Sequence, residues 1–101
     1  MGMKEIEHCD SMADVRRNVD RLDREIVALL AERAQYVAQA ARIKDDIDTV
    51  RLPGRIEQVV ENVKRLAGEQ GLDPAIVEAA YRPMVDAYVE FERREFVRLK
   101  G

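Results

Sequence analysis

Three cations lie on or beside a face of a predicted helix that usually carries apolar side chains. From residue 12 to about residue 44, apolar residues recur every three or four positions, a spacing typical of an amphipathic helix. At 100° per residue, Arg33 and Lys44 point along the apolar stripe that starts at Val15, and Arg16 borders it. A charged side chain on a buried face is costly unless an opposite charge pairs with it. This pattern predicts a small ligand with two negative groups.

The same positions have a second interpretation that needs no ligand. Long cationic side chains can reach solvent at the edge of a helical bundle, and Arg33 can pair with an internal acid such as Asp23. The spacing alone leaves both interpretations open for Arg33 and Lys44. Arg16 adds a constraint, because it lies 17 residues before Arg33, or roughly 25 Å along a straight helix. If Arg16 belongs to the same ligand site, it must come from another copy of the chain.

A carboxylic acid near the end of the chain is a further candidate for the functional site. Glu92 and Glu95 both fall on the face of a predicted helix that carries Tyr81, Val85 and Tyr88. Periodicity does not choose between the two acids. Glu92 lies farther from the chain end and is expected to be the buried one. A buried carboxyl group tends to stay protonated, and it can then donate a hydrogen bond.

Three helices account for these positions, so the fold class is all-α. Ser11 followed by Asp14 predicts the start of a first helix of more than 30 residues, roughly 45–50 Å long. Residues 45–52 lack a helical period and are expected to form a loop. Pro53 suits the first turn of a second helix, which Gly71 ends. Asp73-Pro74 then predicts the start of a third helix that continues to the end of the chain.

The first helix is too long for two shorter helices of the same chain to cover. Its apolar stripe must be buried against something, and a second copy of the chain is the simplest cover. We therefore expect an intertwined helical homodimer. Residues 11–101 are expected to form one helical domain, and residues 1–10 a frayed N-terminal segment.

Composition excludes several other classes of function. The 101 residues carry a net charge of −3, which argues against a nucleic-acid partner. The sequence has one cysteine and one histidine, so we expect neither a disulfide within the chain nor a metal site. No apolar run approaches the ~20 residues that span a bilayer, and no signal peptide is visible. A cytoplasmic protein without a membrane partner is expected.

These residues resemble the all-helical chorismate mutases. The resemblance rests on Ala13-Asp14-Val15-Arg16, Val19-Asp20-Arg21-Leu22-Asp23, the run from Ile26 to Leu30, Arg33, and Ile43-Lys44. The loop proline with Arg55 and the turn Gly71-Leu72-Asp73-Pro74 match the same family, so the similarity extends from about residue 10 to residue 94.

The resemblance implies an intertwined dimer with two sites and assigns a role to each candidate residue. Arg16 would reach across from the partner chain, and Arg33 and Arg55 would help to hold the substrate carboxylates. Lys44 and Glu92 would donate to the ether oxygen of the substrate. Ile56 and Val89 would contribute to substrate binding. Rearranging chorismate to prephenate is intramolecular, so the resemblance implies no nucleophile, base, metal or cofactor.

Some positions depart from the mutase pattern. Many mutases carry an acid, which contacts the substrate ring hydroxyl, where this chain has Ile56, and often an aspartate where it has Leu52. These departures resemble the related isochorismate pyruvate lyases, which make salicylate and pyruvate. Against the lyases, this chain has Glu92 where the lyases, and also many mutases, carry glutamine. We expect a chorismate mutase, with the lyase as the alternative and a non-catalytic helical dimerisation module as a second alternative.

Overall fold

The first helix begins where its sequence signal predicts. The computed structural model describes residues 5–101, and within them helix α1 extends over Met12–Ile43. The Ser11 side-chain oxygen accepts a hydrogen bond from the Asp14 N–H at 3.2 Å, and the Ser11 carbonyl accepts one from the Val15 N–H at 3.2 Å. Ser11 is therefore the N-cap, because it satisfies N–H groups that have no partner inside the helix.

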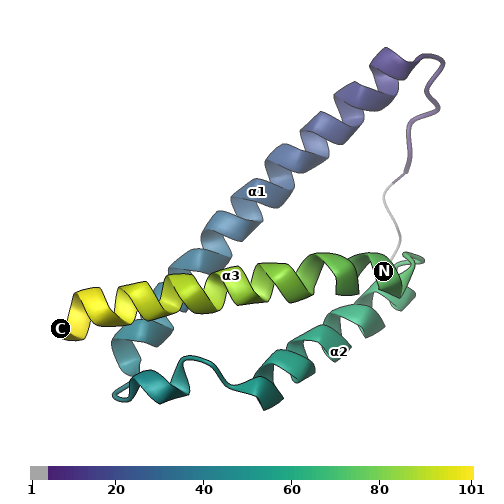
Figure 1. Cartoon of the computed structure of the whole chain (residues 1–101). Helices are drawn as coiled ribbons and strands as arrows, with labels where there is room; N and C mark the ends of the chain where they lie inside the picture. Colours follow the sequence, from purple (N-terminus) through teal and green to yellow (C-terminus); the bar gives the residue numbers. More distant parts are fainter. Residues whose placement is uncertain (1–4) are drawn as a thin grey trace. The chain divides into compact units, whose positions relative to one another are not determined.

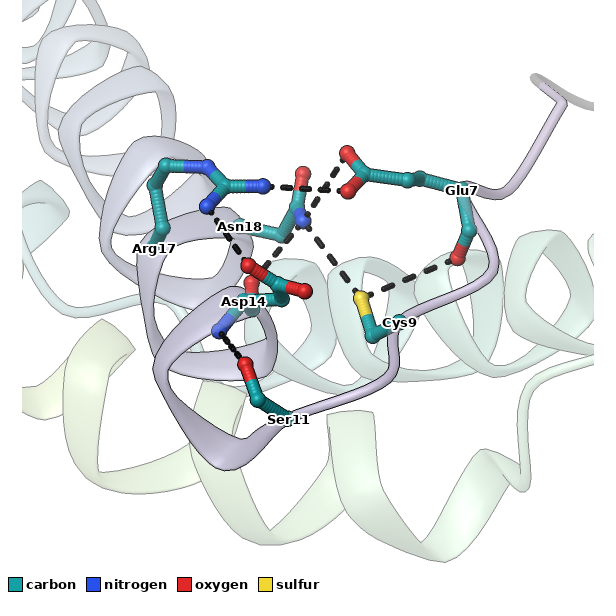
Figure 2. A network of polar contacts seen from close by, with 6 residues as sticks. All are labelled: Glu7, Cys9, Ser11, Asp14, Arg17 and Asn18. Atoms are coloured by element: carbon teal, nitrogen blue, oxygen red, sulfur yellow. Dashed lines mark hydrogen bonds and ion pairs between the residues drawn. The ribbon is translucent and has the colours of Figure 1, made fainter.

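The segment before α1 contacts the first turns of that helix (Figure 2). The Glu7 carboxylate lies 3.0 Å from the Arg17 guanidinium and accepts a hydrogen bond from the Asn18 side chain at 3.3 Å. Arg17 also pairs with Asp14 at 2.9 Å, which lowers the pKa of that carboxyl group. Glu7 and Cys9 thus have partners on α1 in this structure. Residues 1–4 lie outside the described residues, and the expected fraying of residues 1–10 stays a prediction.

A short helical turn, η1 (Ile47–Thr49), interrupts the segment that was expected to be a plain loop. The Asp46 carboxylate accepts a hydrogen bond from the Asp48 N–H at 2.9 Å and so caps this turn. Val50 follows directly and is buried, with 4% of its surface exposed. The prediction missed η1 because three residues are too few to show a hydrophobic period, and their conformation depends on a local cap and one buried side chain.

Helices α2 (Pro53–Glu69) and α3 (Pro74–Lys100) form an antiparallel hairpin (Figure 1). Gly71 has a φ of +74°, a conformation that side chains other than glycine rarely adopt. The Leu72 N–H donates to the Ala67 carbonyl at 2.8 Å and the Gly71 N–H to the Gly68 carbonyl at 3.2 Å, the pattern of a Schellman motif. Asp73 then caps α3 by accepting from the Ala75 N–H at 3.0 Å. The predicted turn is confirmed.

The chain divides into two units, Met1–Gln35 and Tyr36–Gly101. The buried apolar residues all belong to the second unit. Its main cluster joins the last turn of α1, the residue after η1, and α3, and it consists of Ala41, Val50, Val85, Val89 and Phe96, with Ile47, Ile56, Val59 and Tyr81 packed against it.

The first unit has no comparable core. None of its described residues, 5–35, is buried. Large apolar side chains of α1 are exposed instead, and they are Met12, Val15, Val19, Leu22, Ile26, Val27 and Leu29. The all-helical prediction is confirmed for residues 5–101, which contain no strand, and no helix among these residues is long and apolar enough to cross a membrane.

An arginine on α3 connects the two helices of the hairpin. The Arg82 guanidinium binds both carboxylate oxygens of Glu57 on α2, at 2.8 and 3.0 Å, and one oxygen of Glu78 on α3 at 3.1 Å. Hydrogen bonding to Arg82 lowers the pKa of both Glu57 and Glu78. When folding lowers the pKa of a carboxyl group, that group stabilises the folded state at pH values above its ordinary pKa. The stabilisation is lost as the pH falls through the folded-state pKa.

We therefore predict that Arg82→Met lowers the thermal midpoint at neutral pH. The difference from wild type should shrink as the pH falls below 4.5, the ordinary value for these carboxyl groups, and disappear once Glu57 and Glu78 are protonated. Thermal unfolding followed by circular dichroism between pH 7 and pH 3 measures this difference in thermal midpoint. The double variant Glu57→Gln, Glu78→Gln should show the same loss, and adding Arg82→Met to it should change little. A difference that stays constant over this range would contradict the prediction.

Candidate functional site

The end of α1 and the middle of α3 bring an ammonium and a carboxyl group together. The Lys44 Nζ lies 2.7 Å from the Glu92 Oε2. Lys44 directly follows α1, and its N–H still donates to the Ala40 carbonyl at 3.0 Å. Glu92 lies on the α3 face that also carries Val89 and Phe96. Two residues that the sequence singled out separately, 48 positions apart, are therefore neighbours.

Among residues 5–101, Glu92 is the only charged residue that is buried, and 7% of its surface is exposed. Glu95 is half-buried and pairs with Arg98 on its own helix at 2.8 Å. The expectation that Glu92 rather than Glu95 is buried is confirmed. The difference arises because position 92 lies between Val89 and Phe96, both members of the apolar cluster.

The contact between Lys44 and Glu92 is an ion pair without the angles of a hydrogen bond. Among the described residues, the Glu92 Oε2 has no hydrogen-bond partner although it is buried. A buried acceptor without a hydrogen bond is costly, so this oxygen is available for another donor or for a proton of its own.

Lys44 and a protonated Glu92 offer two donors at one place. An ammonium has three donor hydrogens, and a neutral carboxyl group has one. Two such donors stabilise negative charge that develops on a ligand oxygen between them. The second unit, residues 36–101, contains Lys44 and Glu92 but no serine, cysteine or histidine. The arrangement suits charge stabilisation rather than nucleophilic attack.

The other predicted cations are Arg16, Arg33 and Arg55. Arg16 is exposed, and Arg33 is half-buried; both belong to the first unit of the chain, so their approach to the Lys44 group stays a prediction. Arg55, in the first turn of α2, is exposed and donates to the Gln58 side chain at 2.7 Å. In this structure Arg55 therefore has a partner on its own helix.

Ile56 and Val89 were predicted to contribute to substrate binding. Val89 is buried in the main apolar cluster and Ile56 packs against that cluster. Ile56 also lines a hollow of about 190 Å³ between the start of α2 and the middle of α3. The remaining residues of this hollow are Arg51, Pro53, Glu57, Arg82 and Asp86.

Sequence reasoning missed the pairs that border this hollow. Arg51 lies 3.0 Å from Asp86, and Arg82 binds Glu57. These partners are separated by 35 and 25 residues, so no helical spacing connects them. Sequence reasoning also missed Lys100, which donates to the carbonyl groups of Arg42 and Lys44. The position of Lys100 in the last turn of a helix, where cations are favoured, was the available signal.

A second hollow lies in the first unit, where the segment before α1 faces that helix. It has a volume of about 640 Å³. Its apolar lining includes Ile6, Val15, Val19 and Leu22, and Cys9 also lines it. Three of these are positions of the α1 stripe, so the hollow is part of the apolar surface that α1 leaves uncovered.

Comparison with known proteins connects this geometry to one family. The family described as chorismate mutase type II matches residues 15–93, which include Lys44 and Glu92. An isochorismate pyruvate lyase of Pseudomonas aeruginosa is 31% identical over 99 residues, covering 98% of this chain and 98% of that protein.

Two relatives carry the mutase name. A bifunctional chorismate mutase/prephenate dehydratase of Aquifex aeolicus is 30% identical over 97 residues, which cover 91% of this chain and 26% of that longer protein. A chorismate mutase of Methanocaldococcus jannaschii is 26% identical over 68 residues, covering 66% of this chain and 69% of that protein. The relatives therefore carry both activity names that the sequence left open.

We predict that Lys44→Met destabilises the protein by about 2 to 3 kcal/mol, because it leaves the buried Glu92 without its opposite charge. The double variant Lys44→Met, Glu92→Leu should recover most of this loss, since no charge then stays buried. Urea unfolding at one fixed protein concentration measures both. The control is Arg21→Met, which removes an exposed pair with Glu25 and should cost under about 0.5 kcal/mol. Equal costs for Lys44→Met and Arg21→Met would argue against a buried pair.

Proposed function

Because this chain belongs to the chorismate mutase type II family, we propose that it catalyses the rearrangement of chorismate to prephenate. The observation that supports this most is the Lys44–Glu92 pair at 2.7 Å, in which a buried acid lies beside an ammonium group and among apolar side chains. The family establishes an isomerase- or lyase-type enzyme that acts on a chorismate-type substrate, and the choice of reaction is the proposal.

The rearrangement needs positioning and charge stabilisation. One C–O bond of the ether breaks and one C–C bond forms within the same molecule, so no group of the protein becomes covalently attached. Holding the pyruvyl arm over the ring supplies much of the rate, since the two reacting carbons then meet without a search. Negative charge grows on the ether oxygen as its bond breaks, and Lys44 and protonated Glu92 would both donate to that oxygen.

The substrate also carries two carboxylates that must be held. Arginine suits them because its planar guanidinium forms two parallel hydrogen bonds with a carboxylate. We assign this role to Arg33 and Arg55, and to Arg16 of a second copy of the chain. In the free protein Arg55 binds the Gln58 side chain, so that contact must break when a substrate is bound.

The exposed apolar side chains of α1 are the reason to propose a second copy of the chain. The N-terminal half of α1 buries none of its described residues and exposes a row of large apolar side chains. A homodimer that covers this row removes it from water, and it also brings Arg16 of one chain to the site of the other. We propose this dimer as the active form.

A specific observation favours the lyase as the second candidate. The Pseudomonas relative that matches 98% of this chain is named isochorismate pyruvate lyase. Ile56 and Leu52 also stand where many mutases have acids. Ile56 lines a hollow with an apolar side chain, which offers no polar contact to a ring hydroxyl. Both reactions break an ether bond, so Lys44 and Glu92 would serve either one.

The purified protein should convert chorismate to prephenate when chorismate and isochorismate are supplied separately. Lys44→Ala should lower kcat/KM by about 10²- to 10³-fold, the usual cost of removing one donor to a developing oxyanion. Ultraviolet absorbance and chromatography follow prephenate, and fluorescence follows salicylate.

Arg94→Ala provides the matched control, since Arg94 is an exposed cation of α3, and its turnover should equal that of wild type. Salicylate from isochorismate, with little prephenate, would replace the mutase by the lyase. Wild-type protein that turns over neither substrate would favour the dimerisation module.

Glu92→Gln keeps a donor beside Lys44, so it should keep most of the mutase activity. Glu92→Leu has no donor and should lower kcat/KM by about 10²- to 10³-fold. Steady-state rates with chorismate measure both, and equal rates in the two variants would exclude this role for Glu92.

A further inference from the structure

The last residue of α3 binds the end of α1. The Lys100 Nζ donates to the Arg42 carbonyl at 3.0 Å and also to the Lys44 carbonyl. The last four carbonyl groups of an α-helix have no partner inside the helix, and the helix dipole favours a cation there. Lys100 therefore satisfies two acceptors at the place where the chain leaves α1.

Lys100 is itself held by the apolar cluster. Its ammonium lies 5.3 Å from the centre of the Phe96 ring, within the range of a cation–π contact. Glu92, Phe96 and Lys100 follow one another at spacings of four residues, so they share one face of α3. The residue that binds the end of α1 is thus two turns from the acid that faces Lys44.

Both backbone groups of Lys44 are consequently fixed. Its N–H donates to the Ala40 carbonyl at 3.0 Å, and its carbonyl accepts from Lys100. Its side chain then reaches Glu92 at 2.7 Å. Residue 44 lies just outside α1, so without Lys100 its carbonyl would lose a charged donor and the backbone there would be less restricted.

We propose that Lys100 is a positioning residue that fixes the backbone of Lys44 and so directs the Lys44 ammonium toward Glu92 and the substrate oxygen. This inference rests on the proposed function for its kinetic consequence. A displacement of about 1 Å at a reacting group can cost up to about 10²-fold in rate. Because the ether oxygen gains its charge only as the bond breaks, the loss should appear in kcat rather than in KM.

Three variants of the full chain test this inference. Lys100→Met keeps a long side chain over Phe96 and removes the donors, and it should lower kcat about tenfold while KM for chorismate changes less than about twofold. Lys100→Arg keeps a cation and should recover most of the rate. Arg98→Met is the matched control, because Arg98 is a cation of the same helical turn that pairs with Glu95 on its own helix. Its kcat should equal that of wild type.

Unchanged kcat in Lys100→Met, an equal loss in Arg98→Met, or no recovery in Lys100→Arg would each overturn the inference. If chorismate is not a substrate and isochorismate is, the same ratios are measured with isochorismate.

A readout without turnover separates this inference from the proposed function. The coupling between Lys44 and Glu92 is measured by urea unfolding of wild type, Lys44→Met, Glu92→Gln and the double variant. In the Lys100→Met background this coupling should fall by roughly half or more, since Lys44 no longer points steadily at Glu92. An unchanged coupling overturns the role of Lys100 even in an active enzyme. A reduced coupling in a protein that turns over neither substrate supports Lys100 as a positioning residue while the proposed function fails.

Discussion

A buried carboxyl group that faces an ammonium is the constraint on which the second unit depends. Glu92 occupies a position on α3 between two apolar residues of the main cluster, where an uncompensated charge would be expensive. Lys44 compensates it from the residue directly after α1, where Lys100 donates a hydrogen bond to the Lys44 carbonyl. The hydrogen bonds at the end of α1 and the apolar cluster on α3 therefore surround the same ion pair, Lys44 and Glu92.

The two units of the chain solve the problem of burial differently. The hairpin of α2 and α3, with the last turn of α1, has an apolar cluster of its own. The first unit exposes its apolar residues along α1. A single chain of this sequence thus carries one internal apolar core and one exposed apolar surface. The proposed dimer assigns that surface and the partner's Arg16 to the same event, so that assembly and completion of the site coincide.

Local signals in the sequence predicted most of the fold. Ser11, Gly71 and Asp73 each act on backbone groups within four residues of themselves, so their effects can be derived from sequence alone. Helical periodicity also selected the face that carries Glu92. Partners far apart in sequence were beyond this reasoning, as with Arg82 and Glu57, because nothing local connects two helices before their packing is known. The same limit applied to Lys100, which was unassigned until α3 and the end of α1 were seen together.

The turn between α2 and α3 has a consequence for the order of folding. Four residues, 70–73, join the two helices, and the Schellman motif fixes their path. Contacts between helices joined so closely are local in sequence, and local contacts form fast because little chain entropy is lost in closing the loop. The hairpin can therefore nucleate within one molecule. In the proposed dimer, burial of the apolar row of α1 would require a collision between two chains and would therefore depend on their concentration.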